Sequence, residues 1–203
     1  SSQATSLLRR VAVSIACGVT RGCGYLRRLL FIALGLLATT LCGNAGAKPF
    51  TFVAVHDGSR VAVYDHATSA WVGSVNVGAA PIGIAADAQQ RLIAVSNYLG
   101  NTVSLVNIAS RALVGTVAVG AQPLGVVAPA GRTLVYVANF GAGTVSVIDL
   151  ATQTVTQTVN VGNQPSGLAS SASGDRVFVA NTADNSVSVI ATASNTVRID
   201  VTS

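Results

Sequence analysis

The sequence contains no methionine and no glutamate, and it has a single lysine, Lys48. These residue types are common in surface helices, so their scarcity argues against long amphipathic helices. Valine, alanine, glycine, threonine, serine and asparagine are abundant instead, and they favour strands and tight turns. The composition therefore predicts an all-β protein.

Charged residues are few, at 9% of the chain, and they are unevenly distributed. The formal charge is +5, but five arginines lie before residue 48. From Lys48 onward, seven basic residues balance seven aspartates, so this part has no net charge. Without a basic stripe that could contact phosphates, a nucleic-acid partner is not expected.

Residues 26–47 have the form of a signal peptide. They contain two arginines, an apolar run from Leu29 to about Leu41, and the small residues Ala45, Gly46 and Ala47. The apolar run is too short to cross a ~30 Å hydrocarbon core comfortably, so we expect no stable membrane span after cleavage. We predict cleavage after Ala47 and a periplasmic or secreted product.

The three cysteines, Cys17, Cys23 and Cys42, all precede this site. A mature chain would therefore have no thiol for disulfide, metal or redox chemistry. A lipid anchor through Cys42 is the alternative form of the product, although Leu41 is a poor match to the small residues that such anchors require before the cysteine.

The mature part repeats itself every 42 residues. The prolines Pro81, Pro123 and Pro165 fall on this period. So do three further sets: the Val-Gly pairs that begin at residues 77, 119 and 161, the glycines 83, 125 and 167, and the asparagines 97, 139 and 181. The period predicts a leader at 1–47 and repeats at 48–203, with units near 50–80, 81–122, 123–164 and 165–203.

Each period contains four short apolar segments separated by turn residues. Over one period, alternation predicts strands at 134–139, 144–149 and 154–161, and the fourth strand is expected at 166–170. Asp65 and Asp149 precede small polar residues, where a carboxylate oxygen can accept a hydrogen bond from an amide two residues on. Four-stranded units of this length stack radially in β-propellers.

The residues of one unit resemble the YVTN-type β-propeller family, in its lactonase-like and periplasmic group. The resemblance rests on Tyr136-Val137-Ala138-Asn139, Thr144–Asp149, Val161-Gly162 and Pro165. It covers residues 50–203, and it implies the fold far more directly than the function.

The chain departs from this family mainly in length. Family members usually close with about seven blades, whereas the repeats here predict an incomplete arc of just under four. Such an arc leaves open strand edges. Either the sequence is a truncated gene product, or copies associate edge to edge to close a ring.

Residues that break the repeat are the best functional candidates, because recurring residues solve a recurring structural problem. His56 and Asp57 stand where other units have different residues, and Tyr98 and Phe140 follow the repeated asparagines. We predict that these four line a ligand-binding rim, and we assign no catalytic residue, metal ligand or cofactor.

Three other residues are less suited to a functional site. His66 is expected to be solvent-exposed, and Trp71 is expected to pack in the core between blades. Asp184 could contribute to a calcium site only if other loops supplied further oxygens.

These features favour a binding or scaffold module for a protein, peptide or carbohydrate over an enzyme. The resemblance leaves two alternatives open. One is a lactonase-like hydrolase that holds a divalent metal. The other is an accessory propeller of periplasmic redox metabolism, without covalently attached heme because Cys-x-x-Cys-His is absent.

Overall fold

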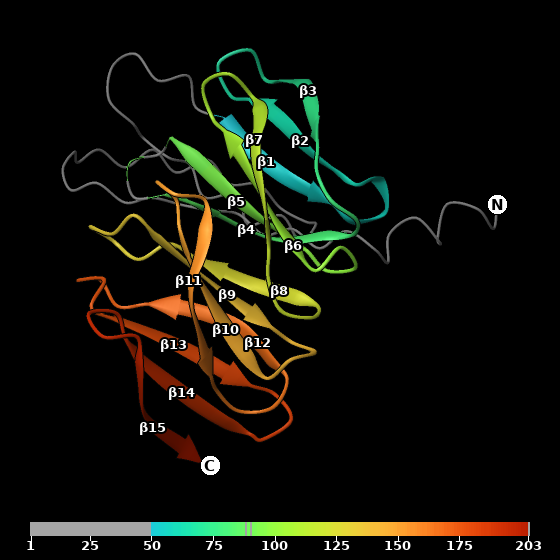
Figure 1. Ribbon diagram of the computed structural model, residues 1–203. Helices are drawn as coiled ribbons and strands as arrows, with labels where there is room; N and C mark the ends of the chain where they lie inside the picture. Colours follow the sequence, from blue (N-terminus) through green and yellow to red (C-terminus); the bar gives the residue numbers. More distant parts are fainter. Residues whose placement is uncertain (1–49, 88, 90, 203) are drawn as a thin grey trace, which may run out of the picture.

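The computed structural model describes residues 50–87, 89 and 91–202. Their strands form four antiparallel sheets, one with three strands and three with four, which fan out as a crescent (Figure 1). We call these sheets blades 1 to 4 in chain order. The predicted fold class, an incomplete β-propeller arc of just under four blades, is confirmed. The predicted leader, with Cys42 and the cleavage site after Ala47, lies outside the described residues.

Blade 1 consists of β1 (Phe50–Val55), β2 (Arg60–Asp65) and β3 (Ala70–Asn76), with a short 3₁₀ turn at His56–Gly58. Blade 2 consists of β4 (Pro81–Ala86), β5 (Leu92–Asn97), β6 (Thr102–Asn107) and β7 (Ala112–Ala118). Blade 3 consists of β8 (Pro123–Val127), β9 (Leu134–Asn139), β10 (Thr144–Asp149) and β11 (Thr154–Asn160). Blade 4 consists of β12 (Pro165–Ser170), β13 (Arg176–Asn181), β14 (Ser186–Ala191) and β15 (Thr196–Thr202).

The strand order in every sheet follows the chain. Strands β9 and β10 coincide with the predicted segments, and β11 is one residue shorter than predicted. Strand β12 begins one residue earlier than predicted, at Pro165, because a proline at the first strand position removes no interior ladder bond.

The hydrophobic core is divided into clusters that lie between neighbouring blades. Between blades 3 and 4, the buried residues are Tyr136, Val145, Val147, Val159, Val177, Val179 and Ile190. Equivalent clusters join blade 1 to blade 2 and blade 2 to blade 3. An interior blade therefore buries both faces of its sheet, which explains its nearly continuous apolar strands.

The inner strands of adjacent blades approach each other at glycines. A Cβ atom on Gly83 would lie 2.2 Å from the carbonyl oxygen of Leu124 in the next blade. A Cβ atom on Gly125 would lie 2.4 Å from the carbonyl oxygen of Ser166. Because no side chain fits in these gaps, the repeated glycine sets the spacing between blades.

The repeated asparagines join the second and third strands within blades 2, 3 and 4. Asn139 is fully buried, and its Nδ2 donates to Thr144 Oγ1 at 3.0 Å and to Ser146 Oγ at 2.9 Å. Asn97 and Asn181 make the same pair of bonds in their own blades. These bonds span the hairpin, in keeping with the structural role expected for a recurring residue.

A glycine packs against each of these side chains. A Cβ atom on Gly120 would lie 2.6 Å from Cγ and 2.8 Å from Cβ of Asn139. Gly78 and Gly162 stand in the same relation to Asn97 and Asn181. The Val-Gly step and the asparagine of the following blade are therefore one packing unit.

We predict that the Gly120→Ala substitution destabilises the protein by roughly 1–3 kcal/mol, because the added methyl group overpacks against Asn139. In an Asn139→Gly background the same substitution is expected to cost much less, because the side chain that it meets is gone. Chemical denaturation of the parent protein, the two single variants and the double variant measures this coupling. The Asn97→Gly background is the control, in which Gly120→Ala should keep its full destabilisation. Equal destabilisation in all backgrounds would contradict the contact between position 120 and Asn139.

Candidate functional site

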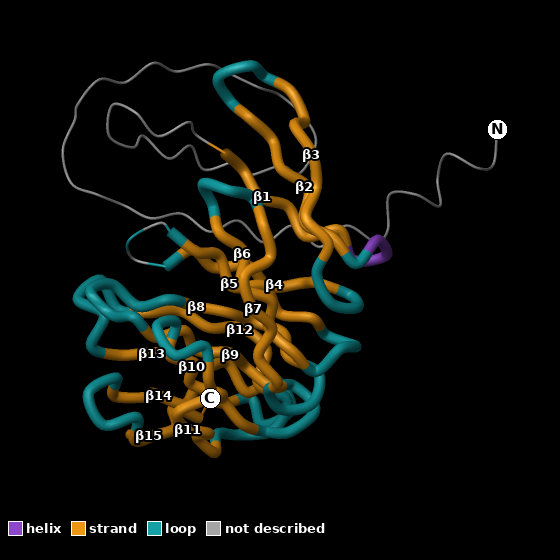
Figure 2. Tube along the Cα trace, turned by 45° about the horizontal axis from the view of Figure 1, so that its top comes forward, coloured by secondary structure: helices purple, strands orange, loops and turns teal. Residues whose placement is uncertain are grey.

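The loops gather at the two ends of the blades (Figure 2). Because the strands alternate in direction, the turn between the second and third strand positions lies at the same end as the connections between blades. We call the four turns at this end, residues 56–59, 98–101, 140–143 and 182–185, the rim turns. All four predicted site residues belong to them.

The rim turns share one backbone shape. Each ends in a residue with left-handed φ: Ser59 at 46°, Asn101 at 51°, Gly143 at 64° and Asn185 at 51°. Only one of these is a glycine, so the surrounding structure holds the others in a conformation that side chains disfavour. The backbone conformation of the rim turns is therefore repeated from blade to blade, even where the residue type differs.

Hydrogen bonds fix the rim turns to the connections between blades. The backbone N–H of Tyr98 donates to the carbonyl of Ala80 at 2.9 Å, and that of Phe140 donates to the carbonyl of Gln122 at 3.0 Å. The side-chain oxygen of Asn101 accepts from the N–H of Gln122 at 2.9 Å. These bonds hold the side chains of the rim turns on a rigid backbone.

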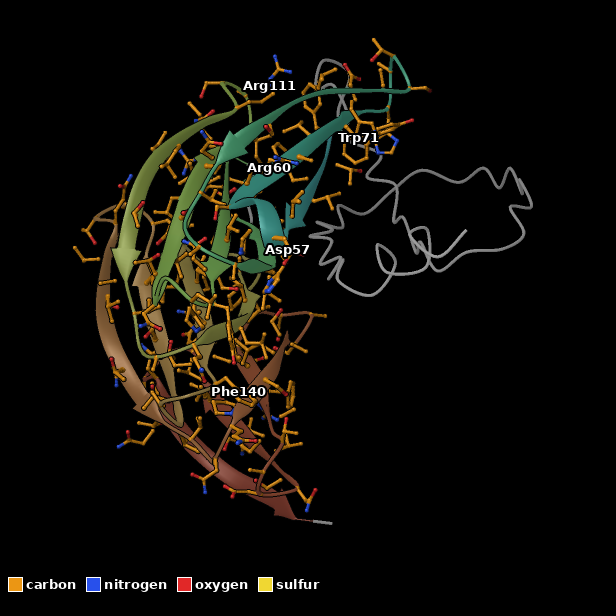
Figure 3. All side chains as sticks on the ribbon, turned by 90° about the vertical axis from the view of Figure 1, so that its right-hand side faces the viewer. Asp57, Arg60, Trp71, Arg111 and Phe140 are labelled. Atoms are coloured by element: carbon orange, nitrogen blue, oxygen red, sulfur yellow. The ribbon has the colours of Figure 1, made fainter. Side chains whose placement is uncertain are left out.

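His56 and Asp57 lie together in the rim turn of blade 1, with His56 Nε2 4.0 Å from Asp57 Oδ1. Their side chains are 31% and 62% exposed, so solvent screens the pair. Figure 3 labels Asp57 and Phe140 on different blades of the crescent. The pair offers a hydrogen-bonding group at the rim of the first blade.

Tyr98 and Phe140 are half-buried, so each presents only part of its ring to solvent. The sequence analysis did not select their neighbour Leu99, whose side chain is 67% exposed. Its equivalents in the other units are Asp57, Gly141 and Ala183. The change of residue type at this position could have indicated Leu99 from the sequence. The Leu99 side chain adds an exposed apolar group to the rim.

Asp184 fastens the rim turn of blade 4. Its Oδ2 accepts from the backbone N–H of Asn163 at 2.6 Å, and its Oδ1 accepts from Asn163 Nδ2 at 2.9 Å. These bonds lower the pKa of the Asp184 carboxyl group below its ordinary value. Both carboxylate oxygens are thus engaged by the protein, and the described residues contain no group of three or more His, Cys, Asp or Glu placed to hold a metal ion.

Two expectations about the opposite end of the blades were wrong. His66 is half-buried, its Nε2 lies 2.7 Å from Thr51 Oγ1, and its ring stacks edge-on against Tyr64. Trp71 is 62% exposed instead of lying in the core, although its ring also contacts Tyr64 edge-on. Its equivalent Leu113 is 45% exposed, because the outer strands of neighbouring blades lie farther apart than the inner strands.

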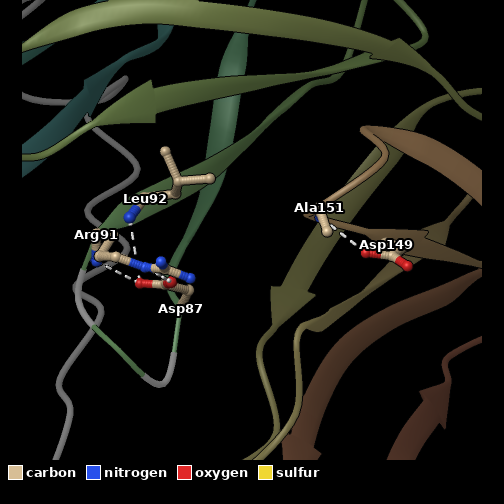
Figure 4. Close-up of polar contacts among 5 residues, drawn as sticks. All are labelled: Asp87, Arg91, Leu92, Asp149 and Ala151. Atoms are coloured by element: carbon tan, nitrogen blue, oxygen red, sulfur yellow. Dashed lines mark hydrogen bonds and ion pairs between the residues drawn. The ribbon is translucent and has the colours of Figure 1, made fainter.

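Turns at that opposite end are held by carboxylates, as the sequence predicted for two of them. The N–H of Ala67 donates to Asp65 Oδ1 at 2.8 Å, and the N–H of Ala151 donates to Asp149 Oδ1 at 2.7 Å (Figure 4). Asp87 was not singled out, yet it is buried and accepts from the N–H groups of residues 91 and 92. These carboxylates serve local turns.

Among the described residues, no helix is long and apolar enough to span a membrane. No family model and no curated protein matches the chain. Solved structures do match, and one is the hydrazine synthase of Kuenenia stuttgartiensis, with a TM-score of 0.69 and 22% sequence identity. The match covers 74% of this chain and 45% of the other, so the chain spans less than half the length of that neighbour. As 1071 solved chains match, the likeness identifies the fold alone.

The depressed pKa of Asp184 gives a test of the bond between the rim turn and the connection. Carbon-detected NMR titration should show the Asp184 carboxyl titrating at a lower pH in the native protein than in the Asn163→Ala variant, which lacks the side-chain donor. Because the folded-state pKa is depressed, the stabilisation is present above the unfolded-state pKa and is lost as the pH falls through the folded-state value. Asp175 is the internal control, since its pKa is lowered by Ser171 and Ser173 and should not move. An unchanged Asp184 midpoint would contradict the assignment.

Proposed function

We propose that the chain is a β-propeller binding module that holds a protein, peptide or carbohydrate ligand on its rim turns. The observation that carries this proposal is the contrast between a repeated backbone and unrepeated side chains. The same left-handed turn presents His56 and Asp57 in blade 1, Tyr98 and Leu99 in blade 2, and Phe140 in blade 3.

The chemistry of these side chains suits contacts with uncharged ligand groups. Tyrosine and phenylalanine rings pack against the flat faces of sugars or the side chains of peptides, and a tyrosine hydroxyl adds a hydrogen bond. The exposed side chain of Leu99 extends the apolar surface. Because hydrogen bonds to the connections fix the turns, little conformational entropy is lost when a ligand binds.

We further propose that the protein acts outside the cytoplasm and belongs to the YVTN-type propellers. The support is the signal-peptide form of residues 26–47 and the 42-residue pattern of the repeats.

Binding can be tested with the immobilised chain and two probes, a displayed peptide library and an oligosaccharide array. We expect enrichment of a defined peptide or glycan, and we expect the Leu99→Ser and Phe140→Ser variants to bind that probe at least about 10-fold more weakly. Leu113→Ser removes another exposed leucine, which lies on an outer strand, and this variant should bind normally. Equal losses in Leu113→Ser and the rim variants, or no enrichment of either probe class, would refute the rim as the binding surface.

The export proposal predicts a defined mature N-terminus. When the chain is expressed with its own leader in a Gram-negative host, N-terminal sequencing of the periplasmic fraction should begin at Lys48. The Ala47→Pro variant is expected to accumulate uncleaved, because signal peptidases require a small residue at the cleavage site. Recovery of intact chain from the cytoplasm in both cases would overturn the proposal.

A further inference from the structure

The rim turns of blades 2 and 3 are joined through one residue of the connection between these blades. Both blades have a neighbour on each side, because β4 lies between β1 and β8, and β8 lies between β4 and β12. The backbone N–H of Gln122 donates to Asn101 Oδ1 at 2.9 Å, and its carbonyl accepts from the N–H of Phe140 at 3.0 Å. The two turns and their connection therefore form one continuous surface. We call it the central rim, and it consists of residues 98–101, 119–122 and 140–143.

The side chain of Gln122 lies over the rim turn of blade 3. Its Oε1 is 2.8 Å from the position that a Cβ atom on Gly141 would take, so the glycine leaves room for the amide. Blade 2 has the opposite arrangement, with Leu99 at the position of Gly141 and Ala80 at the position of Gln122. Among the described residues, the Gln122 amide has no hydrogen-bond partner. It is thus held beside Phe140 and is available to a ligand.

The backbone of the blade 3 rim turn has no donor to spare for a ligand. All four of its N–H groups donate to carbonyl groups of the protein: Phe140 to Gln122, Gly141 to Ala121, and both Ala142 and Gly143 to Asn139. A peptide bound as an added strand would need free main-chain groups at this edge. Recognition at the central rim therefore depends on side chains.

These side chains carry no charge. The central rim contains no aspartate, glutamate, lysine, arginine or histidine. An ionised ligand group would lose hydration there without gaining an ion pair. What the surface offers is the ring of Phe140, the amide of Gln122, and the Tyr98 and Leu99 side chains of the adjoining turn. The composition of the central rim thus favours a neutral ligand.

An aromatic ring beside an amide matches the two kinds of surface that a sugar presents. A hexopyranose has an apolar face of C–H groups, which packs on an aromatic ring, and hydroxyl groups around its edge, which both donate and accept. The glutamine amide also has donors and an acceptor, so it can pair with two neighbouring hydroxyl groups. A sugar ring is already rigid, whereas a flexible peptide would lose conformational entropy without gaining main-chain bonds.

We propose that the central rim binds a neutral oligosaccharide, an inference that rests on the proposed function of the rim turns as a binding surface. One hexopyranose unit packs on Phe140, and its hydroxyl groups bond to the Gln122 amide. The adjoining turn of blade 2, in which Leu99 is 67% exposed, contacts the next unit of the chain.

The test uses the full chain on an array of neutral and acidic oligosaccharides, followed by calorimetry with the glycan that binds best. The repeat itself supplies variants that the backbone tolerates: Gln122→Ala copies Ala80, and Phe140→Thr copies Thr182. We expect binding to weaken roughly 5-fold in Gln122→Ala and at least about 10-fold in Phe140→Thr. Gln164→Ala is the matched control, because its blade has Thr182 in place of an aromatic residue, and it should bind as the parent does.

The dependence on salt gives a second measurement. Between about 20 mM and about 500 mM sodium chloride, the affinity should change less than about 2-fold, because no charge pair is screened. Selection of acidic glycans alone, a steep loss of affinity with salt, or equal losses in Gln122→Ala and Gln164→Ala would overturn the inference. A peptide ligand that is lost in Phe140→Thr would overturn the sugar assignment while leaving the rim as the binding surface. Absence of any ligand would overturn both proposals.

Discussion

The arrangement of the blades depends on the close approach between neighbouring inner strands. At Gly83 and Gly125 a backbone carbonyl of the next blade occupies the space in which a side chain would stand. This spacing brings the valine-rich faces together to form three separate core clusters. It also keeps successive sheets in the same orientation, so that equivalent turns appear at the same end of every blade.

A scaffold fixed in this way leaves the rim turns free to differ in chemistry. Their backbone is held by the left-handed residue at the end of each turn and by bonds to the connections, as at Tyr98 and Phe140. The bonds at Tyr98 and Phe140 are made by the backbone, so they require no particular side chain at these two positions. Recognition can therefore change from blade to blade while the fold stays the same, which is how function is commonly distributed on symmetric scaffolds.

The sequence predicted local features well, because they depend on neighbours along the chain. Alternation placed β9 and β10, and the side-chain oxygens of Asp65 and Asp149 hold the turns expected of them. Predictions failed where exposure depends on the distance to another blade. Trp71 occupies a repeated apolar position, but the spread of the outer strands leaves it in solvent. The partnership of His66 with Thr51 links different strands, and no local pattern indicates it. Leu99 could have been found from the change of residue type at its position.

The equivalence of the junctions also has a genetic consequence. Blades 2, 3 and 4 begin at Pro81, Pro123 and Pro165, and each meets its predecessor through the same register positions. Unequal recombination between two such repeats removes or adds a whole number of 42-residue units. The product keeps every remaining contact in register, since each blade touches only its neighbours. Genes of this kind can therefore change the number of blades in one event. The resulting proteins differ in the length of the arc that their blades form, whereas each blade folds in the same way.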